Sequence, residues 1–135
     1  MPAGAAVSEE RDRYRTARDL GQGAEEAAAR FLETRGMRVL ARSFRTRSGE
    51  IDLVARDGEV LVFVEVKARA SLSWGRPSEA VGWRKRARLE RAARVFLLRQ
   101  GNPEPPCRFD VVEVLARPGE PWSFRHIEDA FGTGA

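Results

Sequence analysis

Cysteine and histidine are almost absent from this 135-residue sequence, and their scarcity excludes several kinds of site. Cys107 is the only cysteine, which excludes an internal disulfide and a cysteine-cluster zinc site, and we interpret it as a small apolar filler. His126 is the only histidine, which excludes zinc hydrolases and nucleases with several histidine ligands. We expect His126 to lie on the surface, near the end of a strand.

Long apolar runs are also missing. No stretch approaches the roughly 20 apolar residues that cross a bilayer, and residues 1–15 lack the basic start and apolar run of a signal peptide. We therefore expect a soluble, cytoplasmic protein without a membrane partner. Residues 1–15 mix small and charged residues without a period, which predicts a flexible tail, and the length of the remainder predicts a single domain over 16–135.

Lysine is scarce as well, although the chain is basic. Lys67 and Lys85 are the only lysines among 24 basic residues, which exceed the 20 acidic residues and give a net charge of +4. The planar donor fork of arginine suits phosphate groups, so the composition is compatible with a nucleic acid partner. An arginine-rich proteome would give the same composition without any such partner.

Hydrophobic periodicity predicts elements in the order αβββαββ. They are a helix over 23–35, strands over 37–44, 50–55 and 60–69, a helix from a cap at Ser78 to Gln100, and strands over 107–115 and 122–127. Gly101 is a helix stop, and Asp57-Gly58 predicts a two-residue type I′ hairpin turn. Helices before and after a central sheet predict a mixed α/β fold.

The predicted hairpin gathers charged residues on one face of the sheet. With Asp57 and Gly58 as turn residues, Asp52 lies opposite Phe63 and Glu50 lies opposite Glu65. The alternation predicts one apolar face, made of Ile51, Leu53, Val62, Val64 and Val66. It places on the other face Glu50, Asp52, Glu65 and Lys67.

Carboxylates so close together repel one another unless a cation lies between them, because cross-strand neighbours are only about 5 Å apart. The cluster therefore favours Mg²⁺ or Mn²⁺, with Asp52 and Glu65 as ligands. Such an ion would activate a water and offset the charge that develops on a phosphodiester, while Lys67 would position or deprotonate the water or bind the phosphate. The alternative is a solvated hairpin face with ordinary salt bridges.

The first predicted helix adds a carboxylate. Glu25 precedes Ala28, Ala29 and Leu32 by three, four and seven residues, which places it beside the stripe that should pack on the sheet. An acid in that position needs a partner, and a metal site on the neighbouring strands would provide one. Glu25 could instead be an acid of the helix N-terminal turn, stabilised by the helix dipole.

Basic residues gather on the second predicted helix and before the hairpin. As candidates for nucleic acid binding we take Arg42, Arg45, Arg47, Arg84, Lys85, Arg88 and Arg91. The alternative is a solvated helix face with Val81, Leu89, Ala92 and Phe96 turned inward.

Two resemblances narrow the function. The string Gly49-Glu50-Ile51-Asp52, followed after twelve residues by Glu65-Val66-Lys67, resembles the PD-(D/E)xK nuclease signature in the version of archaeal Holliday-junction resolvases. A larger part of the chain, about residues 21–131, resembles the YraN-like family of uncharacterised bacterial proteins. The segments that carry this resemblance are Gly23-Ala24-Glu25, Phe31-Leu32, GEIDLVARDG, LVFVEVKAR, GRPSEAV and RFDVVEV.

The family resemblance implies a restriction-endonuclease-like fold with a candidate site at Glu25, Asp52, Glu65 and Lys67. The sequence departs from the family pattern at the first helix, where the expected Gly-Glu pair is replaced by Gly23-Ala24-Glu25. The resemblance implies no established substrate, and our leading hypothesis is an endonuclease, dependent on Mg²⁺ or Mn²⁺, that cuts branched or structured DNA as a homodimer. The alternatives are a nucleic-acid-binding module without catalysis and a protein scaffold.

Overall fold

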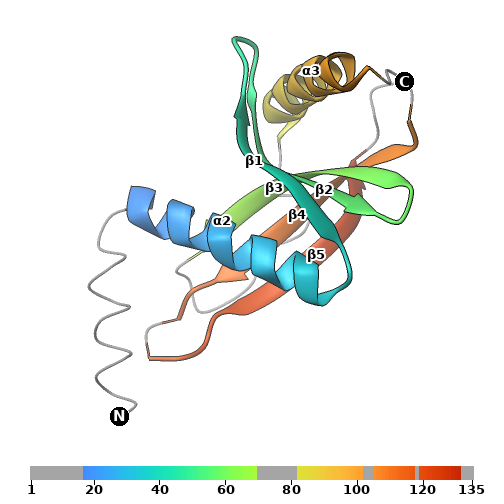
Figure 1. Ribbon diagram of the computed structural model, residues 1–135. Helices are drawn as coiled ribbons and strands as arrows, with labels where there is room; N and C mark the ends of the chain where they lie inside the picture. Colours follow the sequence, from blue (N-terminus) through green and yellow to red (C-terminus); the bar gives the residue numbers. More distant parts are fainter. Residues whose placement is uncertain (1–16, 70–81, 102–104, 118, 132–135) are drawn as a thin grey trace.

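A five-stranded sheet with one helix on each face forms the described part of the chain (Figure 1). The computed structural model describes residues 17–69, 82–101, 105–117 and 119–131, so the predicted tail over residues 1–15 lies outside the described residues. The elements are α2 (Ala17–Thr34), β1 (Arg38–Arg45), β2 (Glu50–Asp57), β3 (Val60–Arg69), α3 (Trp83–Gln100), β4 (Cys107–Leu115) and β5 (Ser123–Phe131). The predicted mixed α/β fold and its order αβββαββ are confirmed.

The strands lie in the sheet in their sequence order, from β1 to β5. All neighbouring pairs are antiparallel except β3 and β4, which are parallel and are separated in the sequence by α3. A parallel pair requires such a crossover, because the chain must return to the same edge of the sheet before the second strand begins. None of the described helices is long and apolar enough to span a membrane.

Two apolar cores lie on the two faces of the sheet. The core beneath α2 contains the helix residues Ala24, Ala28, Ala29 and Leu32, and the core beneath α3 contains the helix residues Leu89, Ala92, Ala93 and Phe96. Because both faces are covered, Val54 and Phe63 are buried on the α3 side. The predicted division of the hairpin into an apolar and a polar face is therefore wrong where α3 packs.

Both helices begin at residues other than those predicted. Helix α2 begins at Ala17, earlier than predicted. Helix α3 begins at Trp83 after Gly82, which is extended and offers no side-chain cap, whereas the predicted cap Ser78 lies outside the described residues. Its predicted end is confirmed, because Gly101 adopts the left-handed conformation and its N–H is bonded to the Leu98 carbonyl oxygen.

The hairpin register differs from the prediction by two positions. Asp57 pairs with Val60, so the turn residues are Gly58 and Glu59, with the glycine at φ +60° in the first central position, as a type II′ turn requires. Leu53 consequently lies opposite Val64. A shift of two residues does not by itself change the face on which a side chain lies, whereas a shift of one residue would have reversed the faces of one strand relative to the other.

The side chain of His126 is buried, and the prediction that this residue lies on the surface is wrong. Its side chain is 1% exposed, and its Nε2 lies 2.7 Å from the carboxylate of the fully buried Asp110. Although burial raises the pKa of Asp110, hydrogen bonds from His126, Arg108 and the Asp129 N–H hold that pKa below its usual value. Asp129 has a positive φ of 50° here, and β5 continues past this irregularity to Phe131, beyond the predicted end.

Candidate metal centre and basic groove

Asp52 lies where β2 separates from β3. The described backbone pairing of these strands ends at Leu53 and Val64, and the N–H of Val66 donates instead to Oδ2 of Asp52 at 2.8 Å. The side chain thus replaces a backbone acceptor. Ile51 packs in the core beneath α3 and Leu53 in the core beneath α2, so the predicted common face of these two residues is wrong. The alternation of β2 breaks at Asp52.

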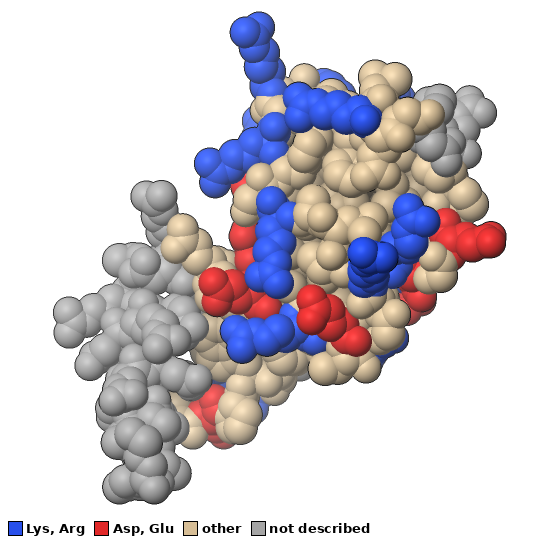
Figure 2. Space-filling model, in the orientation of Figure 1, with Lys and Arg blue, Asp and Glu red and all other residues tan. Residues whose placement is uncertain are grey.

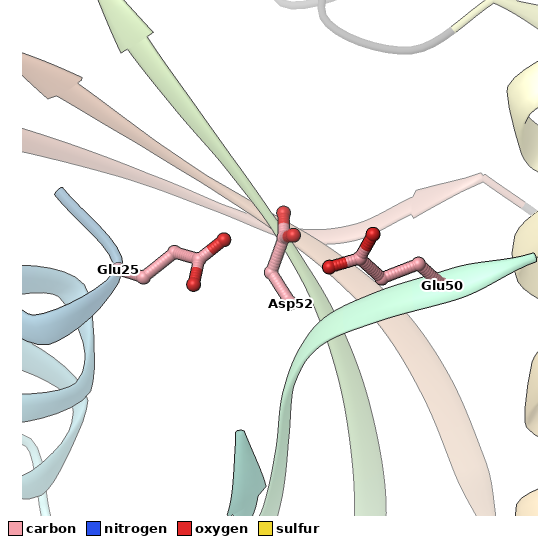
Figure 3. A group of neighbouring side chains, drawn as sticks. All are labelled: Glu25, Glu50 and Asp52. Carbon is pink, nitrogen blue, oxygen red and sulfur yellow. The ribbon is translucent and has the colours of Figure 1, made fainter. Parts of the chain in front are cut away.

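Three carboxylates converge at this break (Figure 3). One oxygen from each of Glu25, Glu50 and Asp52 lies within 4.8 Å of the other two, and we call this group the acidic triad. Glu25 extends from α2, and the other two residues come from β2. Glu25 also accepts a hydrogen bond from the Ser43 hydroxyl at 3.3 Å. The structure thus brings Glu25 to the predicted site residue Asp52 and adds Glu50 to the group.

Glu65 is a fourth carboxylate, on the neighbouring strand. Its side chain is 4% exposed and forms an ion pair with Lys85 of α3. Burial, and then the charge of Asp52, raise the pKa of Glu65 to about 8, although Lys85 opposes the shift. Burial and Asp52 likewise raise the pKa of Glu25 to about 7. Asp52 thus has a carboxylate on each side, and burial together with its negative charge disfavours ionisation of both neighbours.

The donor set fits a hard divalent cation. Carboxylate oxygens are the ligands that Mg²⁺ and Mn²⁺ prefer, and Mg²⁺ commonly uses one or two carboxylates together with waters and substrate phosphates. A cation among these groups would turn their mutual repulsion into attraction. The residues placed to hold it are Glu25, Asp52 and Glu50, with Glu65 beside them.

Lys67 lies two residues after Glu65 on β3. It is half-buried and pairs in register with Glu113 of the parallel strand β4. Strand alternation puts Lys67 on the same face as Glu65. Its predicted part in catalysis stays a prediction.

A groove between the β1–β2 turn and α3 gathers basic side chains. Arg45 and Arg47 line it from the turn, Arg84, Lys85 and Arg88 line it from α3, and Glu50 of the acidic triad lines it as well. Figure 2 shows Lys and Arg side chains at the top of the view, where this turn and α3 lie in Figure 1. Of the other predicted basic residues, Arg42 and Arg91 are exposed but are not among the groove-lining residues.

Gly49 allows the turn and the helix to meet. A Cβ at this position would lie 2.4 Å from the backbone carbonyl oxygen of Arg88. Only a residue without a side chain permits so close an approach. The glycine that precedes Glu50 therefore fixes one wall of the groove against the other.

The sequence missed two features of this site. Glu50 lies on the predicted acidic face but was not among the predicted metal ligands. Its position two residues before Asp52, directly after Gly49, was the sequence feature that could have indicated it. The prediction that Lys85 binds nucleic acid stays a prediction, but its ion pair with Glu65 was not predicted. No local pattern reports this pairing, because it joins a strand and a helix that only the tertiary fold brings together.

The raised pKa values predict how stability depends on pH in the absence of metal. Between the ordinary carboxyl pKa of 4.5 and the folded values of about 7 for Glu25 and about 8 for Glu65, the native state holds more protons than the unfolded state. The free energy of unfolding should therefore fall as the pH rises through this interval. Melting temperatures measured with a chelator between about pH 5 and about pH 9 should decline for the wild type.

Glu65→Gln is the matched variant, because it removes one titrating group and keeps the shape of the side chain. Its melting temperature should decline less with pH than that of the wild type. Parallel pH profiles for the two proteins would contradict the assignment of this dependence to Glu65.

Comparison with known sequences gives consistent matches. The model of a family described as "Uncharacterised protein family UPF0102" matches residues 24–114. A UPF0102 protein of Symbiobacterium thermophilum is 53% identical over 114 residues, covering 84% of this chain and 97% of its own length. UPF0102 proteins of Nocardia farcinica and Pelotomaculum thermopropionicum are each 47% identical, covering 83% of this chain and 88% and 94% of their own lengths.

Proposed function

This chain belongs to the uncharacterised protein family UPF0102, and on that premise we propose that it is a metal-dependent endonuclease that hydrolyses phosphodiester bonds of DNA. One observation carries the proposal: Glu50 belongs both to the acidic triad and to the lining of the basic groove. A DNA strand lying in the groove would therefore place one of its phosphodiesters near the carboxylates of the acidic triad. The proposal includes a restriction-endonuclease-like site of the PD-(D/E)xK kind, made of Asp52, Glu65 and Lys67.

Each group has a distinct part in this proposal. A bound Mg²⁺ or Mn²⁺ would supply Lewis-acid stabilisation of the charge that develops on the phosphate. Glu25, Glu50 and Asp52 would hold the ion, with Glu65 beside it, and Lys67 would orient the attacking water or bind the phosphate. The groove arginines would hold the flanking phosphates through charge-assisted hydrogen bonds.

The proposed substrate is branched or structured DNA, and the proposed active form is a homodimer. Cutting two strands requires two sites, and each chain offers one acidic triad among its described residues. Two copies related by a two-fold axis would present two such sites to a substrate with two equivalent strands.

The experiment is a cleavage assay with branched, single-stranded and duplex DNA in Mg²⁺, in Mn²⁺ and in chelator. We expect metal-dependent cleavage, fastest on the branched substrate, and none in chelator. If protein free of contaminating nuclease cuts none of the three DNAs in either metal, the proposed activity is wrong.

The groove alone also supports a second candidate, a nucleic-acid-binding module without catalysis. Its binding would be sensitive to salt and indifferent to metal. Arg84→Ala and Arg88→Ala would weaken binding, whereas Asp52→Ala would not. Metal-dependent cleavage would exclude this candidate.

A further inference from the structure

Lys85 contacts the candidate metal site and also lines the basic groove. Its ammonium group contacts the buried carboxylate of Glu65, and its side chain, 53% exposed, also lines the basic groove. Arg88, one turn further along α3, lines the same groove and is exposed. No described ion pair joins Arg88 to the site carboxylates. The two residues therefore share the groove but differ in their relation to the candidate metal site.

The charges that act on Lys85 are those of the candidate metal site. Burial lowers the pKa of Lys85, but its bond to Glu65 and the charges of Glu65, Asp52 and Glu50 together raise it. A carboxylate as buried as that of Glu65, which is 4% exposed, requires a cationic partner when ionised. In the structure Lys85 provides the positive charge that a bound divalent ion would otherwise provide.

A divalent ion bound by these carboxylates would make the contact between the Lys85 ammonium group and Glu65 less favourable. The ion would satisfy the negative charge of Glu65 and would repel the nearby ammonium group, since like charges a few ångströms apart oppose each other. Because Lys85 lines the groove and its side chain is 53% exposed, a phosphate bound in the groove would offer the ammonium group another partner.

We propose that Lys85 is the resident counter-ion of the candidate metal site and couples metal binding to DNA binding. Without metal it pairs with Glu65. With metal it is released to a DNA phosphate in the groove. This inference rests on the proposed function, because it requires that both ligands bind at these places.

The coupling is reciprocal by thermodynamic necessity. If metal tightens DNA binding by a given factor, DNA tightens metal binding by the same factor, and such factors are commonly about 5- to 150-fold. The measurable quantity is the ratio of the DNA dissociation constant without metal to that with metal. We call this ratio the coupling factor.

The experiment uses the full chain, Ca²⁺ and a fluorescent branched DNA. Ca²⁺ takes the same oxygen ligands as Mg²⁺, and titration calorimetry first measures its binding to the wild type. Fluorescence anisotropy then gives the coupling factor for the wild type, Lys85→Met, Lys85→Arg and Arg88→Met. Thermal melts establish that each variant is folded.

We expect a wild-type coupling factor of about fivefold or more. Lys85→Met should lower the factor towards one by weakening DNA binding only in the presence of Ca²⁺. Arg88→Met should weaken DNA binding equally with and without Ca²⁺ and keep the wild-type factor. Lys85→Arg, which preserves the charge, should retain most of the coupling.

One result would overturn the inference separately from the proposed function. If the wild type binds Ca²⁺ but Lys85→Met, like Arg88→Met, keeps the wild-type coupling factor, Lys85 does not link the two ligands. If the wild type binds no divalent ion at all, the proposed metal site fails, and the inference fails with it.

Discussion

Asp52→Asn should reduce metal-dependent DNA cleavage by at least about 100-fold, since even residues that only support metal ligands commonly contribute 10- to 100-fold. Asp52 stands at the centre of the site, because it shares the acidic triad with Glu25 and Glu50 and raises the pKa of Glu65 from the neighbouring strand. Asparagine keeps the shape and can still accept the hydrogen bond of the Val66 N–H. It removes the charge that a divalent ion requires.

The same variant should not lose stability at about pH 8, because the repulsion that Asp52 exerts on Glu25 and Glu65 disappears with its charge. A fall in activity without a fall in melting temperature would separate a ligand from a structural residue. Initial cleavage rates and thermal melts are the two measurements. Glu59→Gln is the control, because Glu59 is an exposed acid in the β2–β3 turn and should keep the wild-type rate. Undiminished cleavage by Asp52→Asn would refute the assigned site.

Gly49→Ala should destabilise the protein by about 1–3 kcal/mol, the usual effect of forcing extra volume into a packed contact. The added methyl group would lie 2.4 Å from the carbonyl oxygen of Arg88, and a helix backbone atom cannot rotate away as a side chain would. The β1–β2 turn and α3 would have to separate. Because this contact joins the two walls of the basic groove, DNA affinity should fall together with stability.

Gly21→Ala is the matched control. Gly21 lies within α2, and a Cβ there would meet no described atom within 4 Å other than the neighbouring residues and backbone of its own helix. Alanine in a helix interior is favoured over glycine, so this variant should be stabilised by about 0.5–1 kcal/mol. Urea unfolding measures both changes. Equal stability of Gly49→Ala and the wild type would show that the turn and the helix do not depend on this close approach.

Periodicity was sufficient to predict the order of the elements, because apolar residues recur at helix spacing in the helices and at strand spacing in most of the strands. It could not fix the hairpin register, since Asp57-Gly58 and Gly58-Glu59 both offer a glycine for a turn with positive φ. The faces survived that error because the shift was an even number of residues. The predicted face of Ile51 is wrong for another reason. Strand β2 separates from β3 at Asp52, and side chains alternate between the two faces only along a regular strand.

The sequence was sufficient to select the candidate site residues, but it did not predict most of the contacts that they make. Asp52, Glu65 and Lys67 followed from hairpin faces and spacing, and Glu25 followed from helical spacing. The bond between Glu65 and Lys85 and the burial of His126 against Asp110 did not, because both depend on tertiary packing between elements far apart in the sequence. A polar residue surrounded by polar neighbours in sequence gives no local sign that it will be buried.

Helix α2 approaches the sheet through alanines, and the size of these side chains determines how far Glu25 can reach. Ala24, Ala28 and Ala29 are fully buried, so the helix backbone lies nearer to the strands than bulkier residues would allow. Glu25 is the one member of the acidic triad that comes from this helix. These three methyl groups therefore act as spacers that set the distance between Glu25 and the two carboxylates of β2, and a larger residue at any of the three positions would move Glu25 away from the acidic triad.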